Sequence, residues 1–135
     1  MIKTVLRYLL AALMVFVGVQ HFVDPEPFER IVPAVLPAPR ALVYLSGVFE
    51  ILGGLGLLLP RTRRAAAWGL IALYVAVFPA NVNMAVNHIA MGDHALSPVV
   101  LWLRLPLQAV FIAWAWWLTW GERPAHPEAR RGGPR

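Results

Sequence analysis

Four long apolar segments make up most of this chain and limit strongly what it can fold into. They run over residues 5–22, 41–59, 65–88 and 98–120. Each approaches or exceeds the roughly 20 mostly apolar residues that an α-helix needs to cross the hydrocarbon core of a bilayer. A segment in lipid must satisfy its own backbone hydrogen bonds, and a single helix does so. The sequence therefore predicts an all-α integral membrane protein, a four-helix bundle whose membrane domain spans residues 1–120.

Composition agrees with this prediction and removes several kinds of chemistry. Hydrophobic residues make up 59% of the chain and charged residues 14%, whereas soluble domains carry roughly 25% charged residues. The chain has no cysteine, which excludes disulfides, thiol redox relays and iron–sulfur clusters held by its own residues. The first segment follows Lys3 and Arg7 as in a signal peptide. It lacks a convincing small-residue cleavage site, so an uncleaved span is favoured.

Positive charge is divided unequally between the two sides that four spans define. One side would carry the N-terminus, the turn at 61–64 and the C-terminal tail. These regions hold nine of the twelve basic residues: Lys3, Arg7, Arg61, Arg63, Arg64, Arg123, Arg130, Arg131 and Arg135. The opposite loops hold only Arg30 and Arg40. By the positive-inside rule both termini are expected in the cytoplasm. Residues 121–135 have almost nothing to bury and are predicted to form a disordered cytoplasmic tail.

A short amphipathic stretch separates the first two predicted spans. Asp24 can cap a helix with Pro25 at its first position. Phe28, Ile31 and Val32 would then form a small apolar side. We predict a short interfacial helix here, lying on the outer membrane surface.

One carboxylate, Glu50, interrupts the second apolar segment. Its helical neighbours three and four residues away are all small: Ser46, Gly47, Gly53 and Gly54. Such a face lets another membrane helix approach closely. Because a charge at mid-bilayer costs about 2.5–3.5 kcal/mol, we expect Glu50 to point into the bundle. There it would be either a neutral acid or a carboxylate paired with a cation or with hydrogen-bond donors.

The predicted partner of Glu50 is Arg104, whose depth in the fourth span is within reach of it. Gln108 lies one turn further along the same face. Pro79 and Pro106 are expected to weaken the third and fourth helices locally. Further polar side chains gather toward the outer ends of the spans. The candidate ligand-binding set is Gln20, His21, Glu50, Asn81, Asn83, His88, Arg104 and Gln108.

Structural explanations compete with function for these residues. Glu50 and Arg104 could form an ion pair that only fixes helix register. His21, Asn87 and His88 could lie at the level of the lipid head groups. His21 and His88 could also ligate a haem from both sides, although no other haem signal is present. No metal site is predicted.

Four stretches resemble the DoxX-like family of small four-helix membrane proteins. They are "GVQHF" (18–22), "IVPAVLP" (31–37), "SGVFEILGGLGLLLPRTRRAAAWGL" (46–70) and "FPANVNMA" (78–85). The resemblance covers roughly residues 5–120 and implies a multi-pass protein of the bacterial cytoplasmic (inner) membrane. Some relatives are associated with quinone-linked sulfur oxidation or act as membrane partners in redox complexes. Relatives that handle disulfides use cysteines, so that role is not carried over to this chain.

These observations favour a membrane subunit that binds a small hydrophobic ligand, such as a quinone, in a redox-linked complex. Glu50 would accept a proton or a hydrogen bond, Arg104 would tune it, and Asn81 would orient the ligand's head group. The chain has no electron carrier of its own, so redox chemistry would require a partner protein. The alternatives are a proton-coupled small-molecule carrier, functioning as a homo-oligomer, and a non-catalytic assembly factor. Whether the protein is an enzyme stays open, and nucleic acid is not an expected partner.

Overall fold

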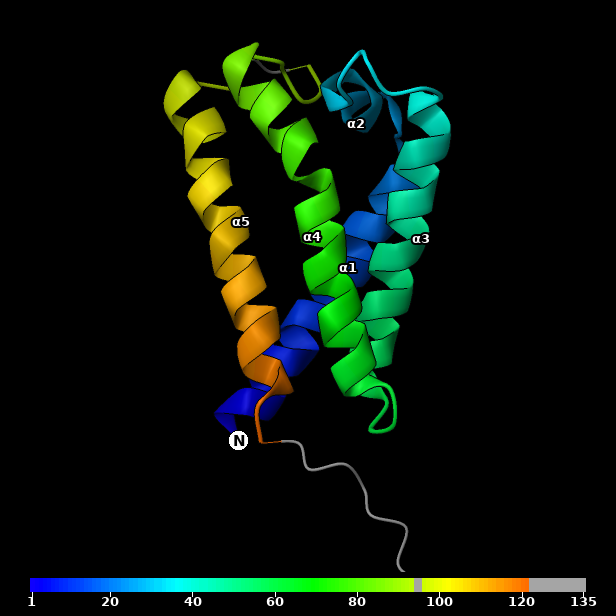
Figure 1. Cartoon of the computed structure of the whole chain (residues 1–135), viewed down its shortest axis with the longest axis vertical. Helices are drawn as coiled ribbons and strands as arrows, with labels where there is room; N and C mark the ends of the chain where they lie inside the picture. The colour runs from blue at the N-terminus through cyan, green and yellow to red at the C-terminus, as the bar shows by residue number, and fades with distance from the viewer. Residues whose placement is uncertain (94–95, 122–135) are drawn as a thin grey trace, which may run out of the picture.

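The computed structural model describes residues 1–93 and 96–121, and this part of the chain is helical without strands. The helices are α1 (Ile2–Val23), α2 (Glu26–Ile31), α3 (Pro39–Leu58), α4 (Arg63–Val86) and α5 (Pro98–Thr119) (Figure 1). All but α2 are long and apolar enough to cross a membrane. The predicted all-α class with four spans is therefore confirmed. The predicted tail lies, beyond residue 121, outside the described residues.

The outer surface of the bundle is apolar. Phe16, Leu52, Val75 and Leu103 each come from a different long helix, and each is more than half exposed. A soluble monomer rarely shows contiguous apolar surface of this extent, whereas lipid tails accommodate it without cost. The chain is accordingly a multi-pass membrane protein.

Glycines bring α1 and α3 into close contact. A Cβ atom added at Gly18 would lie 2.8 Å from the carbonyl oxygen of Gly47, and one added at Gly54 would lie 2.8 Å from that of Ala11. The two backbones approach too closely for any larger side chain at these positions. The predicted small-residue face of α3 is thus confirmed: Gly47 and Gly54 pack against α1, and Gly53 packs against α4.

The bundle has two unlike ends, which we call the N-terminal end and the α2 end. At the N-terminal end α1 begins, α5 finishes, and a short turn joins α3 to α4 (Figure 1). There Gly53 packs against Leu70 and Gly56 against Ala66, so α3 and α4 lie close together. A core of mainly apolar side chains fills this end, where Arg7 and Thr119 are also buried. It includes Leu10, Leu57, Leu70, Ala115 and Leu118.

The helix α2 covers the opposite end of the bundle and contacts all four long helices. Nδ2 of Asn83 on α4 donates to the carbonyl oxygen of Ile31 at 2.8 Å. The Ile31 side chain is buried with Met84 and Leu101. The ring of Phe28 stacks on that of His21 on α1, with centroids 3.9 Å apart. The short helix thus forms a lid on the bundle.

The predicted start of this helix is wrong by one residue. Asp24 does not cap α2, because its backbone N–H donates to the carbonyl oxygen of Gln20 and so ends α1. Pro25 stands at the N-cap of α2, without a side-chain capping bond. Pro27 occupies the first turn, where a missing N–H costs little. The helices α4 and α5 continue through Pro79 and Pro106 without ending.

Candidate ligand-binding site

A cavity of about 380 Å³, which we call the polar cavity, extends from α2 toward the middle of the bundle. All five helices contribute to its walls. Its polar lining residues are His21, Glu50, Tyr74, Asn81, Arg104 and Gln108. The remaining walls are apolar, with Met14, Val17 and Phe111 among them. Five of the eight predicted site residues therefore meet around one cavity.

The predicted pairing of Glu50 with Arg104 is wrong, and the nearest charged or titratable partner is His21. Nδ1 of His21 lies 3.3 Å from Oε2 of Glu50. Arg104 instead directs Nη1 to the sulfur of Met91 at 3.3 Å. The reason lies in the glycine contact, because Gly47 sits against the Cβ atom of His21 and brings that side chain beside α3. Arg104 is on α5, which packs chiefly on α4.

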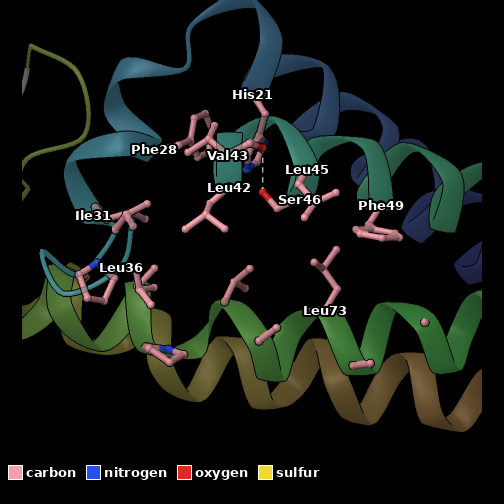
Figure 2. A pocket seen from close by; sticks show the side chains of 18 residues that line it. His21, Phe28, Ile31, Leu36, Leu42, Val43, Leu45, Ser46, Phe49 and Leu73 are labelled. Carbon is pink, nitrogen blue, oxygen red and sulfur yellow. Dashed lines mark hydrogen bonds between the residues drawn. The ribbon is translucent and has the colours of Figure 1, made fainter. Parts of the chain in front are cut away.

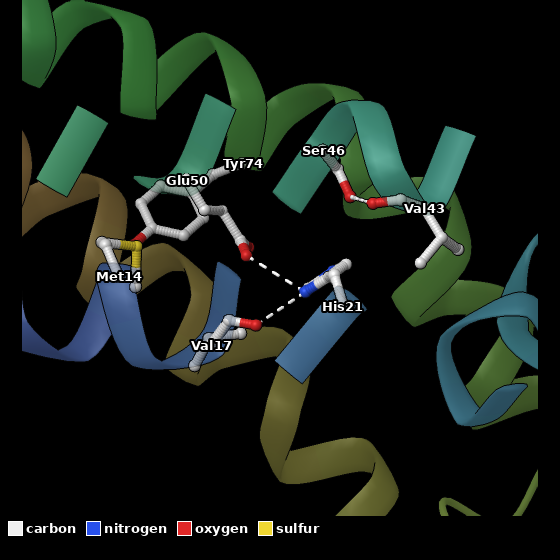
Figure 3. Close-up of polar contacts among 7 residues, drawn as sticks. All are labelled: Met14, Val17, His21, Val43, Ser46, Glu50 and Tyr74. Atoms are coloured by element: carbon white, nitrogen blue, oxygen red, sulfur yellow. Dashed lines mark hydrogen bonds and ion pairs between the residues drawn. The ribbon is translucent and has the colours of Figure 1, made fainter. Parts of the chain in front are cut away.

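The carboxylate of Glu50 is left with an unused acceptor. Nδ1 of His21 also lies 2.8 Å from the carbonyl oxygen of Val17, and this is the shorter and better aligned contact. Figure 3 shows this nitrogen between the Val17 carbonyl oxygen and the Glu50 carboxylate. A single Nδ1–H directed to Val17 leaves Oε2 of Glu50 buried without a hydrogen-bond donor among the described residues. Glu50 is only 8% exposed, so water contributes little. An unsatisfied buried acceptor costs about 1–3 kcal/mol, which a bound donor group would recover.

Two side-chain amides form a chain of hydrogen bonds along the cavity wall, which we call the relay. Nδ2 of Asn81 donates to Oε1 of Gln108 at 2.9 Å, and Nε2 of Gln108 donates to the carbonyl oxygen of Tyr74 at 2.5 Å. The relay ties α4 to α5 within a turn that Pro79 weakens. It leaves Oδ1 of Asn81 without a donor from the described residues. Asn81 therefore offers the cavity an oriented acceptor.

Tyr74 belongs to the site although the sequence analysis did not single it out. Its hydroxyl donates to the sulfur of Met14 at 2.9 Å, and its ring stacks near Phe111. The residue is 7% exposed. A signal for it was present, because Tyr74 lies two helical turns before Asn81 and so shares its face. This face carries the polar residues of α4 that reach the cavity.

Three predicted site residues lie elsewhere. Asn83 holds α2 and accepts from Asn87 at 2.6 Å. His88 is exposed with φ of 51° and lies just beyond the end of α4. Gln20 is partly exposed and lines neither the polar cavity nor the second cavity, which is described next. Since His21 is buried and His88 exposed, the two do not flank a common haem site. The described residues also contain no cluster of three or more His, Cys, Asp or Glu side chains that could hold a metal ion.

A second cavity, which we call the apolar cavity, lies beneath α2 between α3 and α4 (Figure 2). Its volume is about 530 Å³, and its walls are almost entirely aliphatic and aromatic. The two cavities share part of their lining, namely His21, Phe28, Ile31, Val77 and Ala80. The stacked pair of His21 and Phe28 therefore faces both spaces.

Comparison with known proteins assigns a family without an activity. A domain of unknown function, DUF8561, matches residues 10–119, which include all of α2, α3, α4 and α5 and most of α1. No curated protein and no solved structure matches the chain.

Proposed function

The chain belongs to the DUF8561 family, and we propose that it binds a small hydrophobic molecule with a polar head in the polar cavity. A quinone in its reduced, quinol form is an example, because its hydroxyl groups can donate hydrogen bonds to the acceptor atoms of Glu50 and Asn81. The observation that carries the proposal is Oε2 of Glu50, a buried acceptor without a donor in a cavity with mostly apolar walls. Ligand sites are typically apolar spaces of this size with a few convergent polar groups.

The polar groups around the cavity would take distinct roles. Glu50 would accept a hydrogen bond or a proton from the ligand's head group. Oδ1 of Asn81 would supply a second acceptor at a fixed angle, because its amide is held by Gln108. Arg104 would offer a positive charge to an oxygen of the head group. His21, which lies beside Glu50, takes over the tuning role that the sequence had suggested for Arg104.

The membrane setting is part of the same proposal. The excess of basic residues near the N-terminal end favours a cytoplasmic location for both termini. The α2 end would then face the outside, with α2 as an interfacial helix and the polar cavity in the outer half of the bundle. The resemblance to DoxX-like proteins favours the bacterial inner membrane.

A redox role would need a second protein. The chain contains no cysteine, and quinone chemistry requires an electron donor or acceptor. We therefore propose a membrane subunit of a redox-linked complex, which presents the quinone to a partner that carries the electrons. The DoxX-like resemblance supports this choice over a stand-alone carrier.

The test is binding of a quinol to the purified full chain. The protein is purified without added ligand, its bound lipids are extracted, and its thermal stability is measured with and without a decyl-tailed benzoquinol that is kept reduced. At a concentration a hundredfold above Kd, the quinol is expected to stabilise the protein by about 2.7 kcal/mol. Glu50→Gln should lose most of this effect, because an amide N–H₂ can replace the acceptor that the ligand uses.

Glu26→Gln is the matched control, because it makes the same change on the exposed side of α2. It should keep the full response to quinol. The proposal fails if no quinone copurifies and added quinol leaves the wild type and Glu50→Gln equally unaffected.

A further inference from the structure

One face of α4 carries small residues that no other helix covers. Gly69, Ala72 and Ala76 recur on this face and are all exposed. A Cβ atom added at Gly69 would meet nothing within 4 Å. Small residues on a membrane helix normally let a second helix pack closely, as Gly53 and Gly56 do at the N-terminal end. The face of Gly69, Ala72 and Ala76 instead borders the apolar cavity.

The opposite wall of this space is made of bulky side chains on α3. Leu45 and Phe49 line it and are 53% and 52% exposed, so the cavity opens between α3 and α4 to the surface that contacts lipid. Figure 2 shows these side chains and that of Leu73 directed into the gap between the two helices. Lipid therefore has direct access to the apolar cavity.

The shape of the space indicates what can occupy it. At the α2 end it is closed by Ile31, Pro33 and Leu36. A transmembrane helix from a partner or a second copy must run the full thickness of the bilayer, about 30 Å, and is about 10 Å wide. A blind space of about 530 Å³ does not admit one. A flexible hydrocarbon chain does fit, since it can leave through the open side.

The two cavities lie on either side of a single turn of α3. Glu50 lines the polar cavity, and the adjacent Phe49 lines the apolar one. Ile31 and Val77 belong to the walls of both. A molecule with its head at Glu50 could therefore extend its tail beneath α2 into the apolar cavity.

We infer that the two cavities form one site for a single-tailed amphiphile. The head lies against Glu50, the hydrocarbon tail lies along Gly69, Ala72 and Ala76, and the molecule arrives sideways from the bilayer between α3 and α4. This inference rests on the proposed function and adds to it the ligand's tail and its route. It excludes water-soluble solutes as the natural ligands of this site.

Ala76→Phe tests the inference, because it fills the apolar cavity at an exposed position that requires no repacking of the core. Val75→Phe is the matched control, since Val75 is 61% exposed and lines neither cavity. Two probes are compared in phosphatidylcholine nanodiscs that hold the full chain. One is a tetramethyl benzoquinol without a tail, and the other is a benzoquinol with a decyl tail, both kept reduced. Binding to Glu50→Gln is subtracted as background partitioning into lipid.

Lipid is as apolar as the cavity, so the tail is expected to add little affinity in the wild type. A loss of affinity should appear when a bulky side chain blocks the space that the tail occupies. Ala76→Phe is expected to weaken the tailed probe about tenfold and to leave the tailless probe unchanged. Val75→Phe should change neither.

The outcomes separate the inference from the proposed function. If both probes bind and Ala76→Phe weakens neither, or weakens both equally, the tail lies elsewhere and the inference is overturned while the proposed function stands. If neither probe binds above the Glu50→Gln background, the proposed function fails and this inference with it. If Ala76→Phe changes only the oligomeric mass, the face is an interface between copies, which also overturns the inference.

Discussion

The N-terminal end and the α2 end are built from the same four helices but are packed in opposite ways. At the N-terminal end, glycines on α3 receive side chains of α4, and the core consists mostly of leucines and alanines. At the α2 end, Glu50 is buried without a donor. The small residues of α4, which run from Gly69 near the N-terminal end to Ala76, border the apolar cavity and not another helix. The difference teaches that small residues on a membrane helix do not by themselves imply helix contact. Such residues can pack against a side chain, pack against a backbone, or line a cavity.

This contrast indicates that stability and the proposed ligand binding depend on different ends of the bundle. Close packing at the N-terminal end, together with the glycine contact of α1 and α3, would supply most of the stability. The α2 end keeps two cavities and an unsatisfied acceptor, all of which cost stability. Features that destabilise a fold and still converge on one place are typical of functional sites.

The same substitution at two glycines should give opposite results. Gly54→Leu places a side chain where a Cβ atom already lies 2.8 Å from the carbonyl oxygen of Ala11. The backbone of α1 must then move, so we expect a loss of more than about 3 kcal/mol of unfolding free energy, or no folded protein. Gly69→Leu enters open space and should fold with almost unchanged thermal stability. Thermal unfolding in detergent measures both. Equal tolerance at the two positions would contradict the distinction between a small-residue face packed against a helix and one that borders a cavity.

Removing the buried acid should stabilise the α2 end. Glu50→Met replaces an unsatisfied carboxylate by an apolar side chain of similar length, and is expected to raise the free energy of unfolding by about 1–3 kcal/mol. Quinol binding should be lost at the same time. Leu57→Met is the control at the N-terminal end, where a volume-conserving exchange should cost less than about 1.5 kcal/mol. A loss of stability in Glu50→Met would mean that Glu50 holds the helices together and is not poised for a ligand.

The sequence predicts positions along the bundle axis better than positions around it. Positions along the bundle axis follow from helical rise and from the lengths of the apolar segments, so the four spans and the burial of Glu50 are predictable. Positions around the axis are not, because they depend on which helices are neighbours. Arg104 has a suitable depth for Glu50, but α5 packs on α4 and its side chain turns to Met91.

The observed partner of Glu50, His21, is related to the positions of two glycines. Gly18 and Gly47 are small residues on two successive spans, and their contact places His21 beside Glu50. The sequence predicts that α3 has a close neighbour, but not that this neighbour is α1. Any of the three other spans could have supplied the second small residue. The polar face of α4 was more accessible to prediction, since Tyr74 and Asn81 are two turns apart.

The smallest predicted effect concerns the lid and should be confined to the α2 end. Asn83→Leu removes the hydrogen bond to the carbonyl oxygen of Ile31, which is worth about 1 kcal/mol. Hydrogen exchange should therefore become faster by about fivefold at the amides of Val32 and Leu36, which are bonded within this segment. The amide of Leu70 at the N-terminal end should keep its protection.

Asn87→Ala provides the control for the lid. It removes only the hydrogen bond from Asn87 to Asn83, at an exposed position, and leaves the contact with Ile31 in place. It should change exchange at Val32 by much less than Asn83→Leu does. If both variants accelerate exchange equally at the two ends, the lid and the N-terminal core unfold together. The α2 end would then be a cooperative part of the bundle, and the division between the two ends would fail. If only the lid responds, the two ends are energetically separate.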